Sequence, residues 1–232
     1  MCGIAGILGS KMNNHEKINY MTKSLIHRGP DKLNIYHDES YGVYLGHTRL
    51  SILDLSISGD QPMISNSGRY VISYNGEIYN HIELRKNIKN YKWIGSSDTE
   101  TILALVETYG IDQSLSKLKG MFAFCIYDKK YKKIFLARDR FGEKPLYYSN
   151  VNGSLIFGSE LKVFKYCKEI NFELDQSSIS SFMKYGYIAS PSSIYKNIKK
   201  LKQGDYITYD LSSKVLVVNK YWSIINKIQT SN

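Results

Sequence analysis

The chain has 232 residues, a mass of 26.7 kDa and a formal net charge of +10. Hydrophobic residues make up 43% and charged residues 22%, which is typical of a folded globular protein and excludes bulk disorder. Apolar runs are all shorter than the roughly 18 residues of a membrane span, and the N-terminus has no basic segment before its apolar stretch. We therefore expect neither a transmembrane helix nor a signal peptide.

In the first half of the chain, residues 3–8 form a short apolar run that predicts a buried strand. Residues 15–26 have helical spacing and precede Gly29-Pro30, which predicts a helix that ends there. Three further strands and a helix are then expected, at residues 33–37, 42–48, 70–74 and 80–89 respectively. Ser97 and Glu100 have the spacing of a capping box, so a second helix is expected to begin at Ser97.

The second half is richer in strands. They are predicted at residues 121–127, 133–138, 146–149 and 154–158, and a last pair is predicted at Tyr206–Tyr209 and Val215–Trp222. Asp175 is expected to cap a helix that ends at Gly186. Since the strands come in antiparallel-looking sets and the helices in blocks, the pattern favours an α+β fold over a parallel sheet.

The basic residues are mostly scattered lysines, with clusters at 129–133 and 196–202. We interpret the first cluster as a hairpin turn and the second as a surface loop. No nucleic-acid-binding motif accompanies them, so we predict a solvated surface and no nucleic-acid partner. The cysteines, Cys2, Cys125 and Cys167, are odd in number and far apart, which favours reduced thiols and a cytoplasmic location. Cys125 and Cys167 are expected to be inert.

Cys2 directly follows the initiator methionine. Removal of Met1 would leave a residue with both a thiol and a free α-amino group, whose ordinary pKa values are about 8.5 and about 7.7–8.0. Such an amine can serve as the base for its own side-chain nucleophile. The simpler alternative is that Cys2 is a small buried apolar residue beside a strand.

Asn75-Gly76 admits two interpretations. It is a strong signal for a type I′ hairpin turn. Alternatively, the Asn75 amide and the Gly76 N–H form an oxyanion hole for attack on a carboxamide. An amino-acid substrate would also need opposite charges at its two ends. Arg49 is a candidate for its carboxylate, and Asp98 or Glu77 for its ammonium group, although each of these side chains is equally compatible with a surface or helix-start role.

Together these stretches resemble the glutaminase domain of class II glutamine amidotransferases, of the glutamine-hydrolysing asparagine synthetase type. The similarity follows the family's order over essentially the whole chain, and its motifs are Cys2-Gly3-Ile4-Ala5-Gly6, His27-Arg28-Gly29-Pro30-Asp31, Arg49-Leu50-Ser51-Ile52-Leu53-Asp54, Gly59-Asp60-Gln61-Pro62, Asn75-Gly76-Glu77-Ile78-Tyr79-Asn80, Ser97-Asp98-Thr99-Glu100, Gly120-Met121-Phe122-Ala123-Phe124 and Arg138-Asp139-Arg140-Phe141-Gly142. We expect the His27–Asp31 and Arg138–Gly142 motifs to be structural, through turns and ion pairs.

The resemblance implies a four-layer αββα N-terminal-nucleophile hydrolase fold, with two facing antiparallel sheets. It implies that glutamine is hydrolysed through a thioester on Cys2, with the α-amine as base and Asn75 and Gly76 as the oxyanion hole. It assigns the glutamine carboxylate to Arg49, with Leu50, Ser51, Ile52 and Leu53 lining the pocket. The ammonium group is assigned to Glu77 and Asp98, and the resemblance implies no metal site.

Family members usually carry a second domain that uses ATP and Mg²⁺ and accepts the ammonia. Its Ser-Gly-Gly-x-Asp-Ser loop does not occur in this sequence, and neither does a P-loop. We therefore expect residues 2–222 to form the glutaminase domain, residues 223–232 to be a tail or interdomain segment, and cofactors to be confined to the synthetase domain or subunit. The full-length family also suggests a homodimer. Two alternatives stay open: a different carboxylate acceptor, such as a sugar of a surface polysaccharide, or an inactive truncated fragment.

Overall fold

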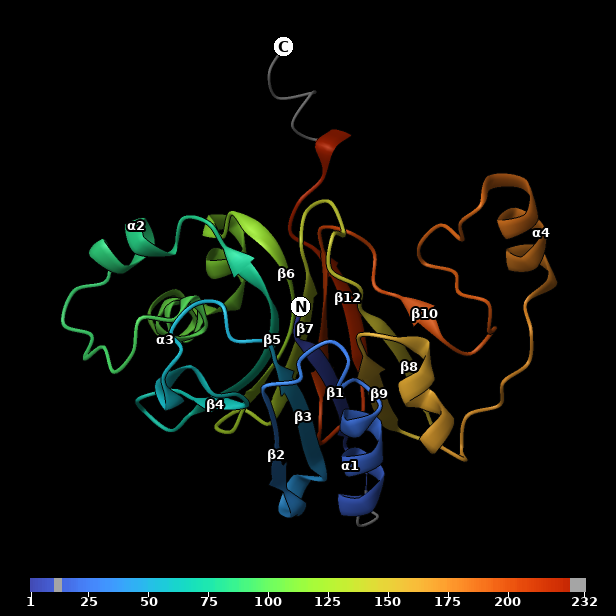
Figure 1. Cartoon of the computed structure of the whole chain (residues 1–232), viewed down its shortest axis with the longest axis horizontal. Coiled ribbons are helices and arrows are strands. Elements are labelled where there is room, and N and C mark those ends of the chain that lie inside the picture. The colour runs from blue at the N-terminus through green and yellow to red at the C-terminus, as the bar shows by residue number, and fades with distance from the viewer. Residues whose placement is uncertain (11–13, 226–232) are drawn as a thin grey trace.

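The computed structural model describes residues 1–10 and 14–225 (Figure 1). Most of the predicted tail, residues 226–232, lies outside the described residues. Within these residues, twelve strands form two six-stranded sheets, in which every strand pair is antiparallel. The first has the order β10-β8-β9-β1-β3-β2 and the second β12-β11-β7-β6-β5-β4.

The strands of the first sheet are β1 (Gly3–Leu8), β2 (Lys32–Asp38), β3 (Val43–Arg49), β8 (Tyr147–Val151), β9 (Ser154–Gly158) and β10 (Lys199–Lys200). Those of the second are β4 (Met63–Ile64), β5 (Tyr70–Ile78), β6 (Gly120–Asp128), β7 (Lys133–Arg138), β11 (Asp205–Asp210) and β12 (Leu216–Lys220). The helices are α1 (His15–Lys23), α2 (His81–Lys86), α3 (Asp98–Lys117) and α4 (Gln176–Tyr185), with short 3-10 turns η1 (Glu39–Tyr41), η2 (Ile57–Gly59) and η3 (Leu161–Tyr166).

Strand β6 shows how the sequence builds the layers. Its residues 122–128 are all buried, because successive side chains point to opposite faces and both faces are covered. Phe122, Phe124 and Ile126 pack in a core with α3, whereas the alternate residues Ala123 and Cys125 pack against the other sheet.

The first sheet repeats this pattern. Ile4 and Leu8 of β1 face the second sheet, whereas Ala5 and Ile7 pack with Ile18 of α1. Three hydrophobic cores therefore separate four layers, α1, the first sheet, the second sheet and α3. The predicted αββα fold is confirmed (Figure 1).

The predicted helix starts and the final strand pair are confirmed. Ser97 caps α3 by accepting a hydrogen bond from the Glu100 N–H, at 3.3 Å. The Glu100 carboxylate accepts instead from the backbone N–H groups of Ile94 and Gly95. Asp175 caps α4, and Gly186 ends it in the left-handed region at φ 75°.

Other expectations were wrong in part. The helix expected at residues 15–26 ends at Lys23, where Ser24 Oγ donates back to the Met21 carbonyl at 2.7 Å. The helix expected at residues 80–89 covers only α2, and the loop expected at 196–202 contains the short strand β10. Residues 129–132 form the expected turn between β6 and β7.

The two arginine motifs play structural roles by different means. Arg28 forms the expected ion pair, with Glu160 at 3.0 Å. Arg138 does not, because its guanidinium donates to three backbone carbonyls, those of Gly142, Lys144 and Leu201. Asp139 in turn accepts from four backbone N–H groups, those of Phe122, Phe141, Glu143 and Lys144, at 3.0–3.2 Å.

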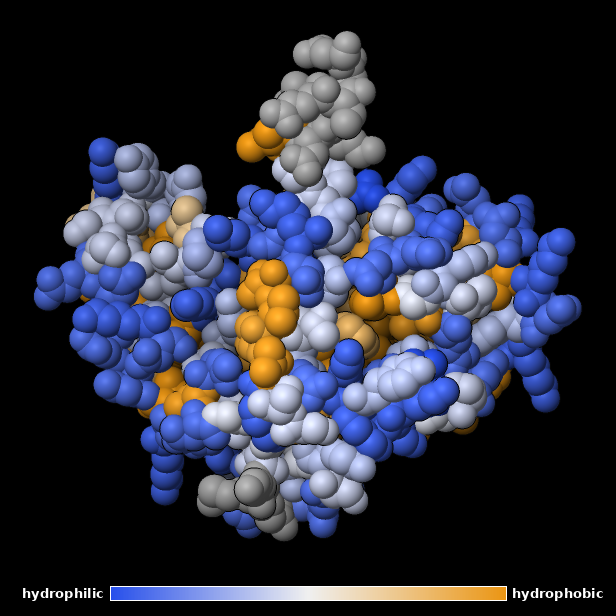
Figure 2. Space-filling model, turned by 180° about the vertical axis from the view of Figure 1, so that it is seen from behind, coloured by the Kyte–Doolittle hydropathy of each residue, from blue (hydrophilic) through white to orange (hydrophobic). Residues whose placement is uncertain are grey.

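Hydrophilic side chains cover most of the face in Figure 2, with a limited apolar patch near its centre. Within the part of the chain that the structure describes, no helix is long and apolar enough to cross a bilayer.

Candidate active site

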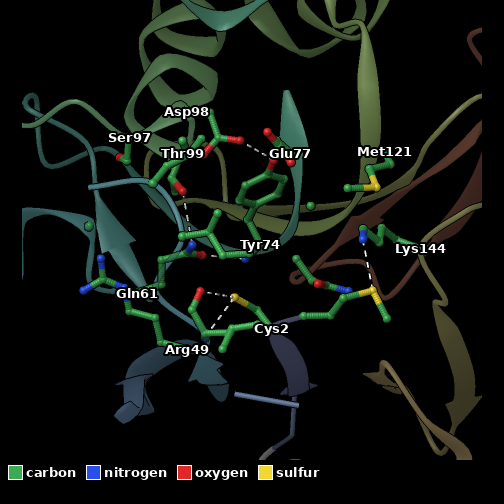
Figure 3. A pocket seen from close by; sticks show the side chains of 17 residues that line it. Cys2, Arg49, Gln61, Tyr74, Glu77, Ser97, Asp98, Thr99, Met121 and Lys144 are labelled. Atoms are coloured by element: carbon green, nitrogen blue, oxygen red, sulfur yellow. Dashed lines mark hydrogen bonds between the residues drawn. The ribbon is translucent and has the colours of Figure 1, made fainter. Parts of the chain in front are cut away.

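A pocket lies where β1 begins and β3 ends, beside β5 and the start of α3 (Figure 3). All the predicted site residues except Ser51 line it; the full lining is Met1, Cys2, Arg49, Leu50, Ile52, Leu53, Gly59, Gln61, Tyr74, Asn75, Gly76, Glu77, Ser97, Asp98, Thr99, Met121 and Lys144. We call Cys2, Tyr74, Asn75 and Asp98 the pocket floor, and residues 50–59 the entrance segment.

Cys2 is half-buried, immediately before β1. Pairing of Gly3 with Thr48 brings it beside Leu50, whose N–H lies 3.4 Å from Cys2 Sγ. The sulfur is also 3.7 Å from the Leu50 carbonyl oxygen. Burial raises the pKa of the Cys2 thiol, although the Leu50 N–H opposes this. A thiol at neutral pH needs a base before it can attack, since the thiolate is the nucleophile.

Two positively charged side chains, those of Arg28 and Lys144, lie beside Met1 and Cys2. Arg28 Nε donates to the Cys2 carbonyl at 3.0 Å, and Lys144 Nζ lies 3.0 Å from the Met1 sulfur. Burial lowers the pKa of the α-amino group of Met1; the charge of Cys2 opposes this, and the charges of Arg28 and Lys144 add to it. The predicted base, an α-amino group on Cys2, forms only when Met1 is removed.

Asn75 and Gly76 lie inside β5 and pair with Ala123 and Phe122 of β6, so the hairpin-turn interpretation was wrong. Asn75 is 1% exposed, and its Nδ2 is buried without a hydrogen-bond partner among the described residues. A side chain at position 76 would collide with the backbone, because a Cβ there would lie 2.3 Å from the Met121 carbonyl oxygen. An unpaired buried donor in a pocket is suited to an anion that forms during a reaction.

Asp98 is the first residue of α3, and Tyr74 and β5 hold it in place. The Tyr74 hydroxyl and the Ile78 N–H both donate to Asp98 Oδ2, at 2.6 Å and 2.9 Å. Burial and the Asp98 charge raise the pKa of Tyr74 well above its usual value, so the phenol stays protonated and donates. Figure 3 shows Asp98 and Glu77 on the side of the pocket opposite Cys2. The two carboxylates can therefore face a cationic group at one end of a ligand.

Arg49 lines the pocket but is already engaged. Its guanidinium donates to Asp60 Oδ1 at 2.8 Å and to the Ser56 carbonyl at 2.9 Å, and also to the Asp54 carbonyl. Figure 3 shows the guanidinium turned away from the Cys2 sulfur. Arg49 therefore anchors the entrance segment in this structure.

The comparisons with known proteins decide the family. The sequence model of one family, described as "Glutamine amidotransferase domain", matches residues 1–222. This chain belongs to that family. The amidotransferase domain is 40% identical to a putative glutamine-hydrolysing asparagine synthetase 2 of Methanocaldococcus jannaschii, over 97% of this chain and 47% of that protein. It is 38% identical to asparagine synthetase 1 of Bacillus subtilis, over 90% of this chain and 33% of that protein.

The amidotransferase domain therefore spans about half, or less, of the length of these curated relatives. Among solved structures, it superposes on a glutamine phosphoribosylpyrophosphate amidotransferase of B. subtilis with a TM-score of 0.71. The sequences are 18% identical, and the match covers 95% of this chain and 49% of the other. This likeness shows the shared fold.

Eight of the lining residues were not predicted as site residues, and three of them, Gln61, Tyr74 and Lys144, make contacts that shape the pocket. Gln61 bridges the floor, because its Nε2 donates to Thr99 Oγ1 at 3.1 Å and its Oε1 accepts from the Tyr74 N–H at 2.7 Å. Lys144 is 4% exposed, and burial followed by the charge of Arg28 lowers its pKa. Gln61 lies within the motif at residues 59–62, and Lys144 lies two residues after the motif at residues 138–142. These motifs were the sequence signal that could have identified both residues.

Side chains with the spacing to hold a metal ion lie elsewhere. In residues 1–10 and 14–225, the group of three side chains with suitable spacing is His15, His37 and Glu39, and none of them lines the pocket. The described part of the pocket thus offers a thiol, an amide and carboxylates, which suit nucleophilic chemistry on an amide.

Proposed function

We propose that this amidotransferase domain hydrolyses L-glutamine to glutamate and ammonia through a thioester on Cys2. The observation that carries the proposal is the buried Nδ2 of Asn75, which has no hydrogen-bond partner in the described part of the chain and lies in the pocket that holds the Cys2 thiol. A thiol is a nucleophile for amide carbons, and a free buried donor stabilises the oxyanion that such an attack creates.

In the proposed reaction, the α-amino group of Cys2 takes the thiol proton and Sγ bonds to the side-chain amide carbon of glutamine. The carbonyl electrons move to oxygen, where Asn75 Nδ2 and the Gly76 N–H donate hydrogen bonds. The C–N bond then breaks, and the amine returns its proton to the leaving nitrogen, which departs as ammonia. Water adds to the thioester with the same base, and glutamate leaves.

Substrate orientation follows from the charges of the lining. Asp98 and Glu77 bind the α-ammonium group of glutamine. We propose that Arg49 binds the α-carboxylate by releasing the carbonyls of Ser56 and Asp54 while Asp60 holds the guanidinium. Leu50, Ile52 and Leu53 form the adjoining wall. The predicted role of Ser51 in this wall was wrong, because Ser51 does not line the pocket and its N–H donates to Asp31 Oδ2 at 2.7 Å.

We further propose that the ammonia serves a synthetase half that makes asparagine with ATP and Mg²⁺. The relatives named above are called asparagine synthetases and are at least about twice as long as the match, which supports this acceptor. The amidotransferase chemistry itself is assigned to side chains, without a metal or cofactor. The three free cysteines support a reducing compartment, which is why we place the protein in the cytoplasm.

The test is glutamate release from L-glutamine by the purified chain, with intact mass recorded to confirm loss of Met1. Cys2→Ala is expected to abolish turnover, and the control Cys125→Ala is expected to keep it, because Cys125 is buried outside the pocket. Turnover that survives Cys2→Ala would disprove the thioester route. A Met1-free chain without turnover would instead support the inactive-fragment alternative.

A further inference from the structure

His15, His37 and Glu39 lie together at an edge of the first sheet, and we propose that they bind a divalent transition-metal ion such as Zn²⁺. Their ligand atoms all lie within 4.8 Å of one another. His15 Nε2 is 2.7 Å from Glu39 Oε1, and the two imidazole rings meet edge to face with centroids 4.4 Å apart. Zinc bonds of roughly 2.0–2.2 Å in tetrahedral geometry place ligand atoms roughly 3.3 Å apart, so small side-chain rotations suffice.

The three ligands come from three separate elements. His15 begins α1, His37 lies near the end of β2, and Glu39 begins η1. The ring of buried Tyr44 on β3 packs against His15 at 5.4 Å and helps to orient it. Folding brings His15 to Glu39, which lies 24 residues later in the chain, so an ion bound here stabilises the folded state.

The donor set selects the class of ion. Two imidazoles and one carboxylate suit Zn²⁺, Co²⁺, Ni²⁺ or Cu²⁺, whereas Mg²⁺ and Ca²⁺ prefer oxygen ligands alone. The exposed side of the cluster is open to water as a further ligand, as the side chains of His15 and Glu39 are 37% and 63% exposed.

Neighbouring charges are compatible with a cation. Asp38 lies between His37 and Glu39 in the chain, and its Oδ2 accepts from the Tyr127 hydroxyl at 2.9 Å. The ammonium group of Lys132 makes a cation–π contact with Tyr41, because its Nζ lies 3.8 Å from the centroid of the Tyr41 ring.

The position of the cluster points to a structural role. In the pairing of β1 with β3, Gly3 lies opposite Thr48 at the Cys2 end, and Leu8 lies opposite Val43 at the other end. Val43 also pairs with Asp38, so the cluster lies at the end of the sheet farthest from Cys2 (Figure 1). β2 is an edge strand, and a metal ion would clamp it to the start of α1.

The test is calorimetric titration of Zn²⁺ into the full chain, purified without a histidine tag and stripped with EDTA, in a Cys2→Ala background that removes the accessible thiol. His37→Ala in that background is expected to weaken Zn²⁺ binding at least about tenfold, since even outer ligands of a metal contribute this much. His27→Ala is the matched control, because His27 lies 2.9 Å from Glu160 in another exposed His–Glu pair that borders Lys162.

His27→Ala is expected to keep the affinity of the Cys2→Ala chain. Added Zn²⁺ should raise the melting temperature of that chain and of His27→Ala, but not of His37→Ala. Equal Zn²⁺ affinity in the Cys2→Ala chain and in His37→Ala would overturn the proposal, and so would the absence of saturable binding. Because His37 is exposed at a strand end, the substitution is compatible with folding, which a circular dichroism spectrum verifies.

Discussion

The pocket floor and the entrance segment are built in different ways. On the floor, Tyr74 and Asn75 are 2% and 1% exposed, and β5 and α3 hold them through pairing and through the Asp98 carboxylate. In the entrance segment, Leu55 and Ile57 are 76% and 82% exposed, and its regular structure is limited to η2. The proposed chemistry thus lies on buried strand and helix residues, whereas the entrance segment is largely exposed and is held by the hydrogen bonds of Arg49 to the carbonyls of Ser56 and Asp54.

Among changes that keep the Cys2 nucleophile, the largest effect is expected from Asn75→Ala on the floor. Loss of the unpaired Nδ2 removes one oxyanion donor, which lowers kcat by about 10²–10³-fold with little change in KM. Steady-state glutamate release measures it. Ser73→Ala is the control, because Ser73 is buried on the same strand outside the pocket and donates to the Gly46 carbonyl. A loss of kcat of less than about fivefold in Asn75→Ala would show that the Asn75 amide is not part of the oxyanion hole.

The pH profile tests the floor through its proposed base. The neutral α-amine accepts the thiol proton, so activity is expected to fall as pH drops below the pKa of the amine, about tenfold per unit. In the chain that retains Met1, burial lowers the pKa of the Met1 α-amino group and the charge of Lys144 adds to this. We expect the same charge to act on the α-amino group of Cys2 once Met1 is removed, so Lys144→Met should shift the acid limb to higher pH. Activity that stays level down to pH 5 would contradict the amine as base.

His47 offers a stability test beneath the floor. It is fully buried on β3, its Nε2 donates to the Tyr74 carbonyl at 3.0 Å, and burial lowers its pKa to about 4. Between an unfolded pKa of about 6.5 and the folded value, the unfolded state binds more protons, so acidification destabilises the fold, by about 2 kcal/mol at pH 5.

Urea unfolding at pH 7 and pH 5 measures this loss. In His47→Gln, whose amide keeps a donor but does not titrate, the difference between the two pH values should shrink by that amount. An identical pH dependence in both proteins would show that other groups cause the acid destabilisation.

The smallest effect is expected in the entrance segment. Ile57→Ser should change the free energy of unfolding by no more than about 0.5 kcal/mol, since the side chain is largely exposed. Thermal unfolding measures the stability and glutamine titration the KM. A KM increase above tenfold would place Ile57 in contact with the substrate and end the distinction between the two regions.

Much of the fold was predictable because apolar runs report burial directly, as on β6, whose residues 122–128 are all buried. Asn75-Gly76 shows where local signals mislead. Gly76 is needed because the Met121 carbonyl of the neighbouring strand leaves no room for a Cβ, not because the chain turns there. That neighbour is distant in sequence, so turn statistics cannot detect it.

The site was predictable where a residue carries its chemistry in its own motif, as Cys2 does. Tyr74 and Lys144 were missed because their roles depend on contacts across the chain. Tyr74 bonds to Asp98, 24 residues away, and Lys144 lies against Met1, 143 residues away. The hydrogen bond from Arg49 to Asp60 was equally unpredictable, since a sequence motif identifies a cationic side chain but not its partner in the fold.

The burial of two of the three thiols has a practical consequence. Cys125 and Cys167 are fully buried, and burial raises the pKa of each, so neither reacts readily in the folded protein. An alkylating reagent applied under native conditions therefore counts Cys2 alone. The fraction of molecules labelled at Cys2 can then be compared with the fraction that turns over glutamine. Under the proposed mechanism, the ratio of the two gives the share of molecules that have lost Met1.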